Sequence, residues 1–264
     1  MKTRAIIFAF LLPVLAFAQP SGVRQADVVP GRTPDSPTFE EYFNPAPQGA
    51  VTTDEDGFIR DWVILEPIAK PIRSNTVFTD SYLRDVFSQQ YFKGQLAPVL
   101  PKDGKKEKVV CDITPAGSMW VMPGEKVEEP KQVLETRKLQ WRAVESKMFN
   151  VKLFRFAAGL QKDVYGVIFW MATVVECDED IPNVRLAVGS NGASMWWING
   201  EEALLMSADR RMVQDDCMSR RLTLRKGRNI IWGSVINGPG MSDCCVRFVD
   251  EDGNPVKNIK VYCR

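Results

Sequence analysis

The sequence predicts an all-β protein, an antiparallel β-sandwich of the jelly-roll type with one short helix. From about Val109 onwards, short segments rich in β-branched and aromatic residues alternate with turn residues, as in proteins built from many short strands. Tyr165–Glu176 is apolar at both sets of alternating positions, which is typical of a strand buried on both faces. Asp80–Phe92 shows a helical spacing of apolar residues, with Thr79 or Asp80 available as a cap.

The expected strands are bounded by turn signals along most of the chain. Asn-Gly, Lys-Gly and Asp-Gly pairs favour tight turns, because their residues tolerate a left-handed backbone. A first strand is expected near Phe58–Leu65. The others are Val109–Ile113, Leu139–Val144, Val151–Ala157, Tyr165–Glu176, Val184–Gly189, Ser194–Ile198, Ala203–Met206, Arg221–Leu224, Asn229–Ile236, Cys245–Val249 and Lys257–Tyr262.

The N-terminal residues predict export. Lys2 and Arg4 precede an apolar run that ends at Ala18 in an Ala-x-Ala cleavage signal, so residues 1–18 are expected to be a signal peptide. No later run approaches the roughly 20 apolar residues of a membrane span. We therefore expect a secreted or periplasmic protein without a membrane anchor. Residues 19–52 are rich in proline and predict an extended arm or linker, and residues 53–264 the β-sandwich domain.

The composition excludes several classes of function. The formal charge of +1 becomes −1 when Lys2 and Arg4 are removed, so no basic surface for nucleic acid is expected. The chain contains no histidine, which excludes Ser-His-Asp and Cys-His sites built from these residues. Its six cysteines have no C-x-x-C spacing, so a zinc site is not expected. We expect most of the cysteines to be buried or structural rather than reactive.

Two adjacent tryptophans lie between Asn-Gly pairs in the stretch NGASMWWINGEE. Neighbouring residues of a strand point to opposite faces, so Trp196 and Trp197 cannot both face the same core. In one interpretation, both rings are packed, one on each side of a sheet. In the other, one ring forms a platform for the apolar face of a sugar, and Asn191, Asn199 and Glu201 at the turns supply hydrogen bonds.

A long polar segment, Ser207–Asn229, contains aspartates and arginines close together in sequence. The simplest interpretation is a solvated loop with surface ion pairs, which stabilise a fold little individually. Two alternatives are a saccharide site in which arginine and aspartate bind hydroxyl groups, and a structural Ca²⁺ site, because carboxylate oxygens suit that ion. The candidate sugar ligands here are Asp209, Arg210 and Arg211, and the candidate Ca²⁺ ligands are Asp215 and Asp216. No other cofactor is expected.

Two further features are compatible with a ligand site. The stretch INGPGMSDCC contains a tight turn after Asn237 and before Asp243, which either lines a cleft or simply joins two strands. Paired carboxylates can hydrolyse glycosides without histidine, and the cluster Asp178–Asp180, like Asp215 with Asp216, offers such pairs. Clusters of this kind occur in most soluble proteins, so catalysis by them is not favoured.

Four stretches resemble the galactose-binding-like jelly-roll module of secreted polysaccharide-degrading proteins. They are GFIRDWVILEPI, MWWINGEEAL, LTLRKGRNIIWGSVINGPG and VRFVDEDGNPV, in the expected order from Gly57 to Val256. The most similar type is the non-catalytic module that accompanies the α/β-hydrolase domain of Bacteroidales acetylxylan esterases. The positions that match this pattern are Trp62, Trp197, Asn199, Gly200, Gly227, Asn229, Asn237, Gly238, Asp250 and Gly253. Most of them are turn or core positions, and no hydrolase sequence follows before Arg264.

The resemblance implies a secreted, non-catalytic carbohydrate-binding or accessory module in plant polysaccharide degradation. Its expected partners are a xylan-type polysaccharide or a carbohydrate-active enzyme. One alternative is an acetylxylan esterase or another hydrolase whose catalytic domain lies outside this chain. Another is a structural module that docks on a partner and binds no sugar. The candidate sugar-binding residues are Trp196, Trp197, Asn199, Asp209, Arg210, Arg211 and Asn237.

Overall fold

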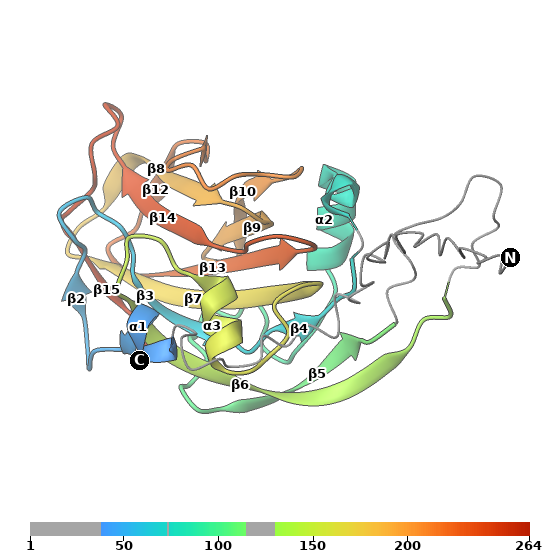
Figure 1. The fold of residues 1–264 in the computed structure, drawn as a ribbon. Helices are drawn as coiled ribbons and strands as arrows, with labels where there is room; N and C mark the ends of the chain where they lie inside the picture. The colour runs from blue at the N-terminus through green and yellow to red at the C-terminus, as the bar shows by residue number, and fades with distance from the viewer. Residues whose placement is uncertain (1–37, 73, 115–129) are drawn as a thin grey trace, which may run out of the picture.

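The fold was obtained as a computed structural model, which describes residues 38–72, 74–114 and 130–264. The predicted signal peptide and the first half of the predicted arm lie outside these residues. The described chain forms an antiparallel β-sandwich, which confirms the predicted fold class (Figure 1). Its helical segments are α1 (Phe39–Tyr42), the 3-10 turn η2 (Asn75–Val77), α2 (Asp80–Phe87) and α3 (Leu153–Gly159).

The larger sheet has eleven strands and the smaller sheet has four. The main path of the larger sheet is β1 (Phe43–Pro45), β6 (Leu134–Ser146), β3 (Asp61–Leu65), β7 (Val167–Cys177), β13 (Gly227–Asn237), β9 (Ala193–Ile198) and β10 (Glu201–Met206). Its other strands are β2 (Val51–Thr52), β4 (Ile68–Ala69), β5 (Lys106–Asp112) and β15 (Ile259–Tyr262). The smaller sheet contains β8 (Ile181–Ser190), β11 (Cys217–Met218), β12 (Leu222–Leu224) and β14 (Cys244–Val249).

Strand β7 lies at the centre of the larger sheet and is buried on both faces. Phe169 and Met171 point into the core between the two sheets, whereas Trp170 and Ala172 point to the opposite face. This alternation follows from the two-residue period of a strand. The prediction for Tyr165–Glu176 is therefore confirmed, because each alternating set of apolar residues has its own core.

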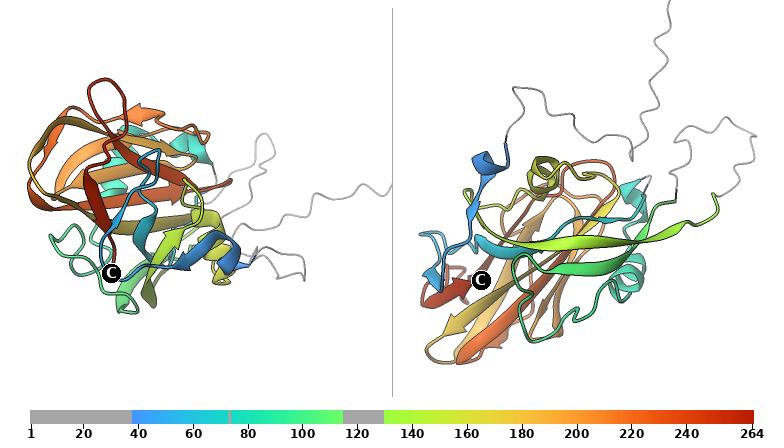
Figure 2. Two further views of the ribbon diagram at one scale, coloured as in Figure 1. Left: turned by 90° about the vertical axis from the view of Figure 1, so that its left-hand side faces the viewer. Right: turned by 90° about the horizontal axis from the view of Figure 1, so that it is seen from below.

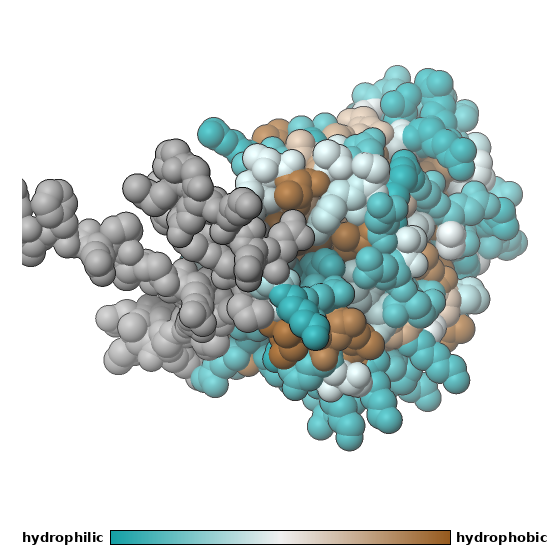
Figure 3. All heavy atoms as spheres, turned by 90° about the vertical axis from the view of Figure 1, so that its right-hand side faces the viewer, coloured by the Kyte–Doolittle hydropathy of each residue, from teal (hydrophilic) through white to brown (hydrophobic). Residues whose placement is uncertain are grey.

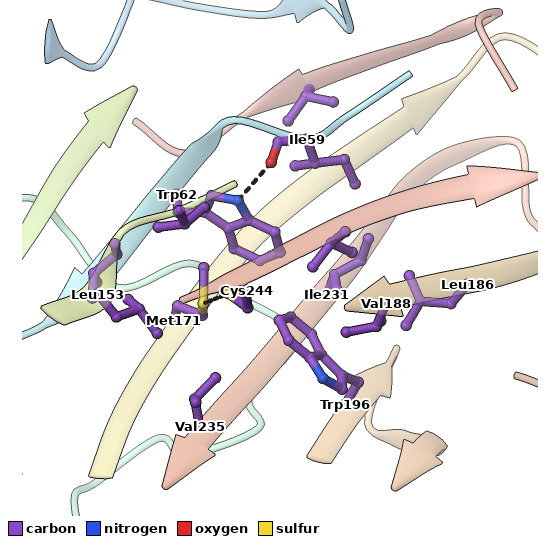
Figure 4. Packing of buried hydrophobic residues seen from close by; sticks show 14 of the residues in the cluster. Ile59, Trp62, Leu153, Met171, Leu186, Val188, Trp196, Ile231, Val235 and Cys244 are labelled. Atoms are coloured by element: carbon purple, nitrogen blue, oxygen red, sulfur yellow. Dashed lines mark hydrogen bonds between the residues drawn. The ribbon is translucent and has the colours of Figure 1, made fainter. Parts of the chain in front are cut away.

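The core between the sheets contains Trp62 and Trp196, together with residues of β7, β8, β13 and β14 (Figure 4). The buried indole N–H of Trp62 donates to the carbonyl oxygen of Ile59 at 2.9 Å, so this polar atom is satisfied inside an apolar environment. The thiol of Cys244 lies 3.9 Å from the sulfur of Met171. All six cysteines are free thiols and five of them are buried, which confirms that most are buried, as expected.

A second core lies on the other face of the larger sheet, under α2 and the segment that follows it. Four tryptophans of this face, Trp141, Trp170, Trp197 and Trp232, pack against Phe87, Tyr91 and Phe92. The predicted helix is shorter than expected and ends at Phe87 instead of Phe92. The chain leaves the helix there, and Tyr91 and Phe92 pack against the ring of Trp170.

Two expectations about local structure were wrong. Val151–Ala157 is not a strand: after one β-bridge at Val151 the chain forms α3, whose buried Leu153, Phe156 and Ala157 have helical spacing. The protein therefore has more than one short helix. β1 pairs with β6 and β2 with β15, so strands of the larger sheet already occur within the predicted arm, before residue 53. In two further views, β5 and β6 form a long ribbon beside the body of the sandwich (Figure 2).

Candidate functional site

The adjacent tryptophans are both packed inside the protein. Trp196 is fully buried and meets Trp62 edge to face, with ring centroids 5.9 Å apart. Trp197 is 5% exposed and stacks on Trp170, with ring centroids 5.4 Å apart and an angle of 17° between the rings. Neither indole presents a face to solvent, so the interpretation in which both rings are packed, one on each side of a sheet, is confirmed, and the open sugar platform is not formed. The second ring is buried because α2 covers its face, where Phe87 packs edge to face on Trp197.

The two turn asparagines in the predicted sugar site bind the protein itself. The amide of Asn199 donates to the side-chain oxygen of Asn229 at 3.0 Å, and its own oxygen accepts from the backbone of Ile230 at 2.9 Å. Asn237 is buried and donates to the carbonyl oxygens of Val164 and Gly240. Both side chains therefore stabilise loops, and the amide N–H groups of both already donate within the protein.

The polar segment after β10 is held by contacts with the rest of the domain. Asp209 accepts a hydrogen bond of 2.7 Å from Asn75 in η2. Arg210 donates to the carbonyl oxygen of Ser207 and forms an ion pair with Asp216. Arg211 is exposed. The interpretation of this segment as a loop with ion pairs explains these contacts.

The two aspartates proposed as Ca²⁺ ligands are bound by arginines. Both oxygens of Asp215 accept from Nε of Arg247, at 3.0 and 3.1 Å, and the guanidinium lies over the ring of Phe58 at 5.0 Å. Asp216 pairs with Arg210. No group of three or more metal-binding side chains occurs among the residues that the structure describes. The residues present do not fit a Ca²⁺ ion, because guanidinium groups occupy the carboxylates.

The carboxylates Asp178 and Asp180 lie in the turn between β7 and β8 and contact neighbouring segments. Asp178 lies 3.4 Å from Lys260, and Asp180 accepts from the backbone N–H of Lys226 at 2.6 Å. Sequence reasoning missed the most perturbed aspartate, Asp61, at the start of β3. Burial raises its pKa to about 6, with Glu145 adding to the shift and Arg60 opposing it.

A hollow of about 320 Å³ lies where the edge strand β10 of the larger sheet meets β12 of the smaller one. Its apolar part is formed by Ile198, Ala203 and Leu222, which belong to or pack against the core between the sheets. Its polar part comes from two segments: residues 199–202, at the turn from β9 into β10, and residues 220–225, which include β12. The polar side chains are Asn199, Glu201, Glu202, Arg220, Arg221, Thr223 and Arg225.

Ion pairs around the hollow differ in strength. Glu202 pairs with Arg84 of α2. Arg220 lies 3.7 Å from Glu201, and both side chains are 75% exposed, so this pair is weak. Arg221 is paired at 3.2 Å with Glu251, outside the hollow. The hollow thus combines an apolar floor with charged groups that solvent can reach.

The structure separates the predicted sugar-binding residues into two regions. Asn199 lies at the hollow, just after β9, whereas Asn237 and the segment from Asp209 to Arg211 lie elsewhere. Asn237 ends β13, eight residues after Asn229, to which Asn199 is bonded. At about 3.4 Å per residue, Asn229 and Asn237 are about 27 Å apart along β13. Sequence analysis did not identify Arg220, Arg221 and Arg225 as candidate site residues. The clustering of these arginines in the sequence is the signal that could have indicated the hollow.

A second cavity, of about 370 Å³, lies between α1, β1, β6 and α3. Its charged residues bind within the protein: Arg142 pairs with Glu66 at 2.9 Å, and Asp103 lies 3.6 Å from Arg264.

The face in Figure 3 is mostly hydrophilic where it is not covered by grey atoms, with hydrophobic residues in small separate groups. In the described part of the chain, no helix has the length and apolar character needed to span a bilayer.

Comparisons with known proteins identify no family for the chain. No protein-family model and no curated protein matches it. A β-glucosidase from Kluyveromyces marxianus is similar over 51% of this chain, with 16% identity and a TM-score of 0.32, and this chain spans only 15% of its length. The PA14 domain of the antifreeze protein MpAFP is similar over 83% of this chain and 95% of that domain, with 8% identity and a TM-score of 0.36. The chain's own residues therefore carry any functional argument.

Proposed function

We propose that this protein is a secreted, non-catalytic carbohydrate-binding module that acts in the degradation of plant, xylan-type polysaccharide. The hollow at the β9–β10 turn is the observation that supports this proposal. A pyranose ring has apolar C–H faces and polar hydroxyl edges, and the hollow offers an apolar floor beside charged and hydroxyl side chains. Its volume of about 320 Å³ is at the lower end of small-ligand sites.

The mode of binding in this proposal differs from stacking on tryptophan. Aliphatic side chains, Ile198 and Leu222 among them, would contact the sugar face, and Thr223 and the arginines would bind its hydroxyl groups. An exposed site of this kind binds a single sugar unit weakly. Repeated units along a polymer, or linkage to other modules, would raise the effective affinity.

Affinity electrophoresis in gels that contain soluble xylan tests the proposal. Thr223 is exposed and lines the hollow, so Thr223→Trp should block the site without disturbing a core. We expect retardation of the wild type and at least about a tenfold weaker affinity of the variant, which equals about 1.4 kcal/mol. Thr136→Trp is the matched control, because Thr136 is an exposed strand threonine of β6 that does not line the hollow.

Unretarded migration of the folded wild type would contradict the proposal and favour the docking alternative. Equal loss of affinity in both variants would place the sugar site outside the hollow. Release of acetate from acetylated xylan by the purified chain would favour the esterase alternative. The absence of histidine from the 264 residues makes that last result unexpected, because no imidazole is present to activate a nucleophile.

A further inference from the structure

We propose that the hollow prefers an acidic sugar, a uronic acid whose carboxylate binds Arg225 and Arg220. This inference rests on the proposed function and adds the chemical class of the ligand. Three arginines and two glutamates line the hollow. Arg84 of α2 already neutralises Glu202, and Glu251 pairs with Arg221, so two guanidinium groups, Arg220 and Arg225, remain beside a single carboxylate. The wall of the hollow therefore favours an anion.

Arg225 is available to a ligand. Its side chain is exposed and lines the hollow, and among the described residues its guanidinium has no partner in an ion pair. Arg220 has only the long, exposed contact with Glu201. A contact of that kind contributes little free energy, so a ligand carboxylate can replace it at low cost.

The backbone of Arg225 is held in place from the protein interior. Its N–H donates to the side-chain oxygen of Asn229 at 3.0 Å, and its carbonyl oxygen accepts from the amide of Asn229 at 2.7 Å. Asn229 is fully buried and also accepts from Asn199. These bonds fix the backbone from which the arginine side chain extends, so a ligand has to order only the side chain and not the backbone.

The chemistry of the guanidinium group favours a carboxylate over a hydroxyl group. Its planar N–H groups match the two oxygens of a carboxylate, and charge-assisted hydrogen bonds of this kind are about twice as strong as neutral ones. A neutral sugar gains only hydroxyl contacts in the same place. The apolar floor can contact the ring in both cases, so the acid group alone should decide the preference.

Two forms of one polymer test the inference: glucuronoxylan and the same polymer after chemical reduction of its carboxyl groups. The two differ in charge and share the xylan backbone. For the wild type we expect about tenfold tighter binding of the acidic form in affinity electrophoresis. The preference should decrease as sodium chloride is raised, because salt screens exposed charges.

Arg225→Gln and Arg220→Gln should each bring the ratio of the two affinities towards one. Arg228→Gln is the matched control, since Arg228 is exposed, lies over the ring of Tyr262 and does not line the hollow. Equal binding of both polymers by the wild type would refute the acidic preference and leave the proposed function intact. Binding of neither polymer would overturn both. A preference that survives in Arg225→Gln and is lost in Arg228→Gln would place the acid-binding groups elsewhere.

Discussion

Replacing Asp61 by asparagine should stabilise the protein at neutral pH. The side chain of Asp61 is buried at the start of β3, directly opposite Glu145 of β6. Among the described residues, its Oδ1 atom has no hydrogen-bond partner. Asparagine has nearly the same shape and carries no charge, so the variant removes a desolvated charge beside a second carboxylate.

The size of the effect follows from the pKa. Burial first, and then Glu145, raise the pKa of Asp61 from 3.8 to about 6, while Arg60 opposes the shift. The folded state therefore binds this proton more tightly than the unfolded state does. Stability from the protonated form is complete below pH 3.8 and is lost as the pH rises through about 6. The shift corresponds to at most about 3 kcal/mol at pH 7 and about half of that at pH 5.

Urea unfolding of the wild type and Asp61→Asn between pH 3 and pH 7 measures this difference. We expect the variant to be more stable at pH 7 and the two proteins to converge near pH 3. Asp178→Asn is the control, because that side chain is 85% exposed and its replacement should change stability by less than about 0.5 kcal/mol. A variant that is no more stable at pH 7, or a gain that persists at pH 3, would refute the reasoning.

Three further predictions concern the packing of the sandwich. Gly233→Ala should lower stability by about 1–3 kcal/mol in urea unfolding, because the added methyl group would lie 2.3 Å from the ring of Trp196; an unchanged midpoint would contradict this packing. Arg247→Leu should cost about 3 kcal/mol by leaving Asp215 unpaired, and Asp215→Leu in the same protein should restore part of the loss. Titration with a thiol reagent should detect Cys217 first in the folded protein and all six thiols after denaturation, whereas fewer than six would indicate a disulfide.

The packed tryptophans move the candidate binding site from aromatic rings to an edge of the sandwich. Aromatic residues contribute large areas to a core, and here Trp141, Trp170, Trp197 and Trp232 stabilise the face under α2. The hollow between β10 and β12 is a place where charged side chains and apolar residues meet solvent. A sugar there would be recognised through arginine and aliphatic contacts.

Local patterns in the sequence determined the type of most elements. Alternating apolar residues and Asn-Gly turns predicted the strands around β9, and the doubly apolar stretch predicted the buried β7. The sequence alone also shows that none of these 264 residues is a histidine, so no imidazole among them can activate a nucleophile. The strand predictions succeed because local backbone geometry depends on neighbouring residues. The short helix α3 was missed because its seven residues also fit a strand.

Long-range packing decided the environment of the candidate residues. Trp197 is buried because α2, more than 100 residues earlier in the chain, covers its face of the sheet. Asp215 binds Arg247 across 32 residues, which changes a candidate metal ligand into half of an ion pair. The hollow itself joins two segments, 198–203 and 220–225, that meet only at the edge of the sandwich. Burial, ion pairing and cavities arise from contacts between distant parts of the chain, so they follow from the tertiary structure alone.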